Sequence, residues 1–293
     1  MPDTLTPQTL SQLPADRPLY GVIGWPVAHS LSPAMQQAAF DACGIPARYV
    51  KIAITPEELP SAIAAMKARP LAGWNCTIPH KNQLFTLVDE CDESSRLIGG
   101  VNTVVNRGGK LTGHSTDGRG WSRAIRDDFG VEIKGLRILL LGAGGAGQAI
   151  AHQAVREGCR DLVLVNRTAE TARELAGQLA RPDIVRTAAW EPVALAAVLG
   201  DIDLIVNASS VGLKPGDPPA LSAGALNPGH MVYDTIYNPS PTGLITEARI
   251  AGGRTANGLS MLLHQGALSF EIWTGREAPL EEMRAALWKA ATV

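Results

Sequence analysis

The sequence predicts an α/β protein built from two domains, and three observations favour this class. A chain of 293 residues is longer than one small core needs and suits two domains. Short apolar runs typical of strands alternate with longer segments of helical periodicity, which favours mostly parallel sheets covered on both faces. From about residue 118 this alternation becomes regular, so we expect the second domain to begin there.

The first half is expected to contain strands that lead into helices. A helix is predicted to begin at Ser32-Pro33, because serine can cap a helix and proline suits its first turn. A second helix start is indicated by Thr55, Pro56 and Glu58. The segments expected to form strands are 19–24, 47–54, 71–77 and two short ones within 99–117 around the turn Gly108-Gly109.

The second half repeats the pattern with longer apolar runs. The segments expected as strands or apolar runs that end in polar residues are 136–142, 161–166, 202–209 and 230–237. The segments expected as helices are 146–158, 168–180, 258–275 and 280–290. The pattern alone does not say to which half the last two helices belong.

Composition excludes several classes of protein. With 45% apolar residues and a net charge of −2, the chain is expected to be soluble and globular, without a basic field for nucleic acid. No stretch approaches the ~20 apolar residues of a membrane span, and the polar N-terminal segment carries no secretion signal. The four cysteines form no CxxC pair and the six histidines show no ligand spacing. We therefore expect no disulfide framework and no metal, and a cytoplasmic location.

A cluster of polar residues follows one predicted strand, in the sequence GWNCTIPHK at 73–81. An amide, a thiol and a hydroxyl close the apolar run, Pro79 fixes the next turn, and Lys81 follows. One interpretation is a loop with an ordinary solvated lysine. The other is a polar pocket that holds an amine where a substrate proton must be moved.

A glycine-rich turn indicates a dinucleotide site. The motif Gly142-x-Gly144-x-x-Gly147 directly follows an apolar strand and opens a helix. Such glycines allow a tight turn, a close approach of the backbone to a pyrophosphate, and close packing of helix on strand. The helix N-terminus adds unpaired N–H groups for the phosphates. In this context a doubly wound Rossmann domain is the better interpretation than a simple tight turn.

The end of the next strand indicates which dinucleotide is bound. An NAD site usually has an acidic residue there, which accepts a hydrogen bond from the ribose 2′-hydroxyl. This chain has Asn166-Arg167-Thr168 instead, so an arginine and a hydroxyl can bind a 2′-phosphate. The alternative is a solvated arginine at the strand end. We expect NADP.

Eight short motifs together resemble the shikimate dehydrogenase family from about Tyr20 to the end of the chain. They are Ser30-Leu31-Ser32-Pro33, Asn75 to Lys81, Val101-Asn102-Thr103, Thr116-Asp117-Gly118, Gly142 to Gly147, Asn166-Arg167-Thr168, Asn207 to Ser210, and Gln265. The resemblance implies reversible reduction of 3-dehydroshikimate to shikimate with NADPH. It also implies a substrate domain (1–117 plus about 258–293) and an NADP-binding Rossmann domain (118–257) separated by a cleft. The protein would be a monomer or homodimer.

The resemblance also assigns roles to individual residues. Lys81 and Asp117 resemble the catalytic pair, although an exposed lysine and a helix-capping aspartate are the simpler alternatives. The residues that resemble substrate ligands are Ser30, Ser32, Thr77, Asn102, Tyr237 and Gln265. The residues that resemble cofactor ligands are Gly142, Ala143, Gly144, Gly145, Ala146, Gly147, Asn166, Arg167, Thr168, Ile236, Gly258 and Glu93.

Several positions depart from the family pattern. Ser115 stands where asparagine is usual, Ser209 where threonine is usual, and Ser260 where glycine is common, while Cys76 replaces a valine. Ser115 and Ser260 lie close in sequence to the expected ligands, so they leave open a shifted substrate such as quinate. One alternative function is therefore a quinate/shikimate dehydrogenase. A second is a catalytically silent NADP-binding module.

Overall fold

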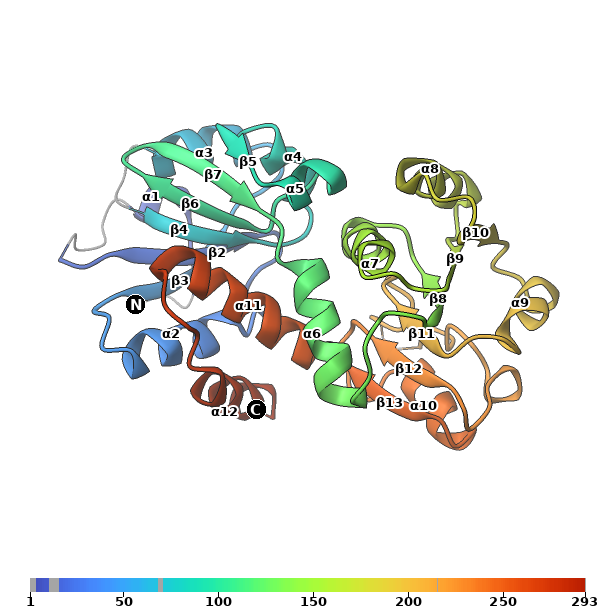
Figure 1. Ribbon diagram of the computed structural model, residues 1–293. Coiled ribbons are helices and arrows are strands. Elements are labelled where there is room, and N and C mark those ends of the chain that lie inside the picture. The colour runs from blue at the N-terminus through green and yellow to red at the C-terminus, as the bar shows by residue number, and fades with distance from the viewer. Residues whose placement is uncertain (1–3, 11–15, 68–70, 215, 293) are drawn as a thin grey trace. The chain divides into compact units, whose positions relative to one another are not determined.

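A computed structural model describes residues 4–10, 16–67, 71–214 and 216–292 (Figure 1). The chain divides into two compact units: unit 1 is Met1–Thr116 with Leu263–Val293, and unit 2 is Asp117–Leu262. The first border lies one residue before the one expected from the sequence. The second lies inside a helix, five residues beyond the one expected.

Unit 1 contains a seven-stranded mixed sheet in the order β1-β3-β2-β4-β6-β7-β5. The first four strands are parallel, β6 is antiparallel to both β4 and β7, and β5 is parallel to β7. Its elements are β1 (Thr4–Leu5), α1 (Pro7–Leu10), β2 (Leu19–Gly24), α2 (Ser32–Ala42), β3 (Arg48–Ala53), α3 (Leu59–Lys67), β4 (Leu71–Cys76), α4 (Lys81–Phe85), β5 (Glu90–Cys91), α5 (Glu93–Ile98), β6 (Thr103–Arg107), β7 (Lys110–His114), most of α11 (Leu259–Thr274) and α12 (Leu280–Ala291).

The strand directions of this sheet bring four loops to one edge. Because β2 and β4 are parallel, both end there, at Gly24 and Cys76. Strand β6 begins at this edge, since Asn75 of β4 pairs with Thr103. Strand β7 ends at it, since His114 also pairs with Thr103. The residues that follow β2, β4 and β7, and those that precede β6, therefore meet at one edge.

The core of unit 1 has a mainly aliphatic cluster near α3 and a group of contacting aromatic rings near α2. Ile52, Leu59, Met66 and Trp74 are buried in one hydrophobic cluster. Helix α12 packs against α2, and the aromatic rings of Tyr20, Phe40, Phe270 and Trp273 contact one another across α2, β2 and α11. The last two helices thus complete the core of the first unit.

Unit 2 is a six-stranded, all-parallel sheet in the order β10-β9-β8-β11-β12-β13. From β8 the chain winds outward through β9 and β10, then returns to β11 and winds the other way, so the order reverses between β8 and β11. Its elements are α6 (Asp117–Phe129), β8 (Arg137–Leu141), α7 (Gly145–Arg156), β9 (Asp161–Val165), α8 (Ala169–Leu179), β10 (Val185–Ala188), α9 (Pro192–Leu199), β11 (Leu204–Asn207), η1 (Ala223–Ala225), β12 (Met231–Asp234), α10 (Gly243–Ile250), β13 (Arg254–Asn257) and the start of α11.

The two faces of this sheet are both covered, as the unbroken apolar runs predict. Along β8, Ile138 and Leu140 belong to the hydrophobic cluster shared with α6 and α7. The alternate residues Leu139 and Leu141 belong to a second cluster, shared with α9 and α10. This two-sided burial explains why the strand has no polar alternation. The expected doubly wound α/β architecture is therefore confirmed.

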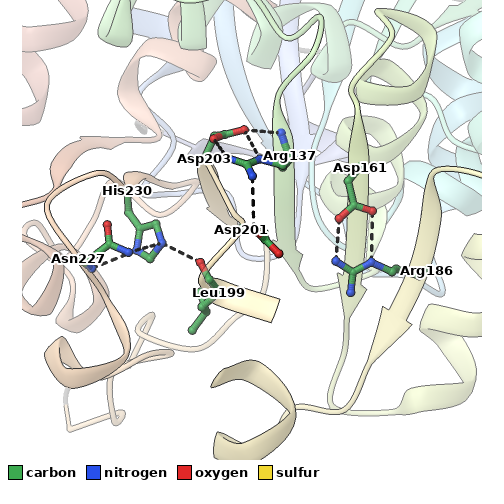
Figure 2. Close-up of polar contacts among 8 residues, drawn as sticks. All are labelled: Arg137, Asp161, Arg186, Leu199, Asp201, Asp203, Asn227 and His230. Atoms are coloured by element: carbon green, nitrogen blue, oxygen red, sulfur yellow. Dashed lines mark hydrogen bonds and ion pairs between the residues drawn. The ribbon is translucent and has the colours of Figure 1, made fainter. Parts of the chain in front are cut away.

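The amino-terminal rim of this sheet is held by ion pairs, as Figure 2 shows. Asp203 accepts from Arg137 Nη2 at 2.6 Å, from Arg137 Nε at 3.0 Å and from the Arg137 backbone N–H at 2.8 Å. Arg186 pairs with Asp161 at 2.7 Å on the neighbouring strands. His230 Nδ1 accepts from the Asn227 N–H, so its Nε2 donates to the Leu199 carbonyl at 3.0 Å. These contacts tie together the strand ends opposite the glycine-rich turn.

We expect Asp203→Asn to lower the stability of unit 2 at neutral pH and to make that stability less dependent on pH. The hydrogen bonds from Arg137 lower the pKa of the Asp203 carboxyl, so its contribution to stability is present above the unfolded pKa and is lost as pH falls through the folded one. Both partners are about one-third exposed, so we expect a loss of only about 1 kcal/mol at neutral pH. Urea unfolding at pH 7 and below pH ~4 should show the difference between variant and parent shrinking on acidification. Asp201→Asn is the control, since Asp201 is 83% exposed; an equal effect there would contradict the assignment.

Candidate functional site

The predicted substrate ligands of unit 1 lie on the loops that meet at one edge of its sheet. Ser32 begins α2 and is buried, and its backbone N–H donates to the Ser30 hydroxyl at 3.3 Å. Thr77 directly follows β4, where its N–H donates to the Ile23 carbonyl of β2 at 2.9 Å. The structure thus brings the loops after β2 and β4 together.

Lys81 is the first residue of α4, and it is held by its own backbone carbonyl and by the side chain of the residue before it. The Val101 N–H donates to the Lys81 carbonyl at 3.0 Å, which places Lys81 beside the segment that carries Asn102. The preceding residue, His80, is fully buried, and its Nε2 lies 2.7 Å from the Ile54 carbonyl. Burial lowers the pKa of His80, while its bond to Ile54 opposes this, so a neutral ring that donates through Nε2 fits the site.

The amides of Asn102 and Gln265 meet in the interior of unit 1. Asn102 directly precedes β6 and is 2% exposed; Gln265 comes from α11, more than 160 residues later, and is 8% exposed. Asn102 Nδ2 donates to Gln265 Oε1 at 3.4 Å and to Thr116 Oγ1 at 2.9 Å. The Thr116 N–H donates to Asn102 Oδ1 at 2.9 Å. Two predicted substrate ligands are therefore in contact.

The predicted cofactor ligands of unit 2 lie at the carboxyl ends of its strands. The turn from β8 to α7 fits a close-lying phosphate group. A Cβ at Gly147 would lie 2.1 Å from the Gly142 carbonyl oxygen, and one at Gly142, whose φ is +105°, would lie 2.7 Å from the Ala208 backbone. Around Gly144 the space is open, and this residue precedes a 12-residue helix without a side-chain cap. Gly145 and Ala146 form the first turn of that helix, and Ala143 is buried behind it. The turn therefore exposes backbone N–H groups.

Asn166 connects this turn to the end of β9. Its Oδ1 accepts from the Ala143 N–H at 3.1 Å, and its Nδ2 donates to the Thr168 carbonyl at 2.9 Å. Arg167 and Thr168 are exposed, and Thr168 precedes α8 without capping it through its side chain. Asn166 thus braces the two loops, while Arg167 and Thr168 are accessible to a ligand.

A buried network shapes the ends of β11 and β12. Asp234 accepts from Asn207 Nδ2 at 3.0 Å, from Thr242 Oγ1 at 2.7 Å and from the Ile236 N–H at 3.0 Å. Burial raises the pKa of the Asp234 carboxyl, and these donors oppose the shift. A Cβ at Gly258 would lie 2.0 Å from the Thr235 carbonyl oxygen, so Gly258 abuts the segment that carries Ile236.

Three predicted ligands are placed in a different unit from the rest of their group. Asp117 is the first residue of α6 and begins unit 2, so it is helical rather than a cap before the helix. Tyr237 also belongs to unit 2, where burial raises the pKa of its hydroxyl. Glu93 begins α5 in unit 1 and is exposed, whereas the other predicted cofactor ligands belong to unit 2.

Two of the three unusual serines have partners of their own. The Ser260 hydroxyl donates to Asp128 and contacts the Tyr233 hydroxyl at 3.1 Å, which ties α6 to the start of α11 within unit 2. The Ser209 hydroxyl donates to Asn207 Oδ1 at 2.7 Å. These contacts give both serines a structural role. Ser115 directly follows β7 in the sequence and is buried.

The described ranges contain no group of three or more His, Cys, Asp or Glu side chains that could bind a metal ion. All four cysteines are thiols. Among the helices in the part of the chain that the structure describes, none is both long and apolar enough to cross a membrane.

The residues that lie behind the predicted ligands were not predicted from the sequence. Tyr49, Asn75, Thr103 and Ser269 form a buried hydrogen-bonded group in unit 1, and Asp234 and Thr242 do so in unit 2. Asn75 and Thr103, and Asn207, which binds Asp234, lie inside the motifs of the family resemblance. Their membership of these motifs was the only feature of the sequence that pointed to them. Tyr49 and Ser269 had no such feature.

The chain is similar to known proteins over most of its length. Residues 22–104 match the shikimate dehydrogenase substrate binding domain, 124–212 the shikimate/quinate 5-dehydrogenase family, and 258–287 the shikimate 5'-dehydrogenase C-terminal domain. A shikimate dehydrogenase (NADP(+)) of Methanopyrus kandleri is 40% identical over 277 residues, covering 93% of this chain and 96% of its own.

Solved structures agree with the fold. A shikimate dehydrogenase crystallised with NADP+ superposes with a TM-score of 0.87 at 37% identity, covering 94% of this chain and 96% of its own. A quinate dehydrogenase of Corynebacterium glutamicum, solved with NAD, gives a TM-score of 0.84 at 29% identity, covering 93% of this chain and 99% of its own.

The parallel sheet of unit 2, with its glycine turn at the strand reversal, defines the class of two-unit α/β proteins with a dinucleotide-binding fold. Within that class, identity of 40% over more than nine-tenths of the chain decides the family. The chain belongs to the shikimate dehydrogenase family.

Proposed function

We propose that this protein catalyses the reversible reduction of 3-dehydroshikimate to shikimate with NADPH. The observation that carries the proposal is the pairing of two sites in one chain of this family. The loops of unit 1 that carry Ser30, Thr77, Lys81 and Asn102 meet at one sheet edge. In unit 2, the glycine turn leaves no room for a Cβ at Gly142 or Gly147. The proposal assigns the substrate to unit 1 and the cofactor to unit 2, with 1–117 and about 258–293 as the substrate domain.

In the proposed mechanism Lys81 is the general acid that protonates the ketone oxygen. NADPH, when bound, supplies the hydride that reduces the ketone. The ammonium of Lys81 stabilises the negative charge that develops on the ketone oxygen and donates a proton to it. In the oxidative direction the neutral amine accepts that proton. Asp117 is the proposed partner of Lys81 at the same substrate hydroxyl. The anchoring of Lys81 by Val101 and of His80 by Ile54 supports a fixed position for the amine.

The remaining proposed ligands bind the carboxylate and the ring hydroxyls of the substrate, and the pyrophosphate and the nicotinamide of the cofactor. Ser30 and Ser32 bind the carboxylate, while Thr77, Asn102, Gln265 and Tyr237 bind ring hydroxyls, since an unpaired desolvated hydroxyl costs about 1–3 kcal/mol. The backbone N–H groups of the turn 142–147 bind the pyrophosphate. Ile236 and Gly258 border the nicotinamide, and Glu93 is a further cofactor contact.

The direct test is a paired assay of the purified protein with shikimate or quinate and with NADP+ or NAD+. We expect the absorbance of the reduced cofactor to grow fastest with shikimate and NADP+. Faster turnover of quinate would favour the quinate/shikimate alternative. Binding of NADPH without turnover of either acid would favour the silent module. Gel filtration of the same sample decides between monomer and homodimer.

We expect Arg167→Ala to weaken NADP+ binding about 10- to 100-fold, because a charge-assisted hydrogen bond to the 2′-phosphate is lost. NAD+ binding should change little, since NAD+ lacks that phosphate. Isothermal titration with both cofactors measures the two effects. Arg181→Ala is a matched control, because Arg181 is exposed and pairs with Asp183 at 2.7 Å. Equal losses for NADP+ and NAD+ would remove the 2′-phosphate argument.

A further inference from the structure

Four side chains form a continuous hydrogen-bonded group inside unit 1, which we name the buried polar array: Tyr49, Asn75, Thr103 and Ser269. Each is at most 5% exposed. The Tyr49 hydroxyl donates to Asn75 Oδ1 at 2.7 Å, so the Asn75 amide must donate on its other side. There Asn75 Nδ2 lies 3.1 Å from Thr103 Oγ1 and 2.9 Å from Ser269 Oγ. The two hydroxyls lie 2.8 Å apart. Every member thus contacts at least one other.

The array contacts the two residues whose amides are proposed to bind the substrate, Asn102 and Gln265. The Thr103 hydroxyl donates to Asn102 Oδ1 at 3.1 Å, and Asn75 Nδ2 donates to the Asn102 backbone carbonyl at 3.2 Å. The Ser269 hydroxyl donates to the Gln265 backbone carbonyl at 2.9 Å. The array therefore contacts Asn102 through its side chain and backbone, and Gln265 through the helix that carries it.

These contacts fix which atom of each amide lies where. The Thr116 backbone N–H can only donate, so the Asn102 atom that it meets at 2.9 Å is the oxygen. The Thr103 hydroxyl donates to the same oxygen. The Asn102 NH2 group is therefore turned toward Gln265, whose Oε1 accepts from it at 3.4 Å. Reversing the Asn102 amide would set its NH2 against the Thr116 N–H, so one orientation of the pair is enforced.

We infer that the buried polar array positions the Asn102 and Gln265 amides and so sets how the protein recognises the ring hydroxyls of its substrate. Thr103 is the main positioning residue, because its hydroxyl donates directly to the Asn102 side chain. Ser269 acts with it from α11. The inference rests on the proposed function, since it takes Asn102 and Gln265 as ligands of the substrate ring.

A purely structural role for the array makes a different prediction. A buried polar group that only holds the core together would, when removed, lower stability and leave discrimination between substrates unchanged. A group that aims a ligand changes the ratio of kcat/KM between substrates that differ by one hydroxyl. The deciding measurement is therefore this ratio.

The test compares Thr103→Val with Thr103→Ser, since valine keeps the shape but removes the hydroxyl, while serine keeps the hydroxyl. Each variant is assayed with NADP+ and with shikimate or shikimate lacking the 4- or the 5-hydroxyl. We expect Thr103→Val to reduce the preference for shikimate over at least one deoxy analogue about 10-fold, the size of one hydrogen bond. KM for NADP+ should stay at the parent value, and Thr103→Ser should restore the preference to within about threefold.

A folded Thr103→Val protein that keeps the parent preference against both analogues would overturn the inference. If the valine variant does not fold, Ser269→Ala takes its place, with the same expected loss and the same contradicting result. A failure of the proposed function is distinguishable, because then the parent protein itself would not oxidise shikimate.

Discussion

Replacing Lys81 with alanine is expected to lower kcat for shikimate oxidation about a thousandfold, because general acid–base catalysis and charge stabilisation are lost together. KM for shikimate should rise much less, since the ammonium interacts most strongly with charge that exists only in the transition state. Lys81 begins a helix, and its backbone carbonyl accepts from the Val101 N–H, next to the proposed ligand Asn102. This contact supports a defined position for the residue.

Steady-state kinetics on parent and Lys81→Ala protein separate the two constants. Lys110→Ala is the matched control, because Lys110 lies on the same sheet but is 60% exposed and pairs with Glu90. The control should retain full activity. A rise in KM with unchanged kcat in Lys81→Ala would mean that Lys81 only binds the substrate.

The second large effect concerns the glycine turn of unit 2. In Gly147→Ala the new Cβ would lie 2.1 Å from the Gly142 carbonyl oxygen, so α7 or the turn must move. Overpacking of this kind costs about 1–3 kcal/mol. We expect NADPH affinity to fall at least about 100-fold, because the N–H groups proposed to bind the pyrophosphate would lose their alignment. Thermal unfolding and NADPH titration measure both effects.

Gly144→Ala separates folding from binding at the same turn. Its Cβ meets nothing within 4 Å, so the free protein should keep its melting temperature. The side chain would, however, stand where the pyrophosphate approaches the backbone, so NADPH affinity should still fall. Gly177→Ala on exposed α8 is the control for both variants, since its Cβ also meets nothing. Parent-like NADPH binding in Gly147→Ala would contradict the dinucleotide assignment.

The sequence predicted the strands that are buried on both faces more readily than short strands and edge strands, for a physical reason. Strands buried on both faces, such as β8 and β9, are unbroken apolar runs that stand out in any sequence. Strand β10 was missed because its middle residues, Arg186 and Thr187, are exposed and it lies at the sheet edge. In unit 1, β1 and β5 have two residues each, too few for any periodic signal.

Candidate ligands could be identified from motifs, whereas the contacts behind them could not. Asn75 and Ser269 are 194 residues apart, and Asn102 and Gln265 are 163 apart. Such pairs arise only when α11 packs on the sheet of unit 1, which no local pattern encodes. Ser260 shows the same limit. Its position near the expected ligands left a shifted substrate open, whereas its hydroxyl contacts Asp128 and Tyr233 within unit 2.

The return of the chain to unit 1 at Leu263 constrains the order of events during synthesis. Residues 117–262 leave the ribosome as a contiguous stretch that can complete its own core. The earlier-made 116 residues lack α11, which supplies Gln265, Phe270 and Trp273, and α12, which packs against α2, until the end of the chain has been made. We therefore expect residues 117–262 to fold first, and unit 1 to become native only after residues 263–293 have been made.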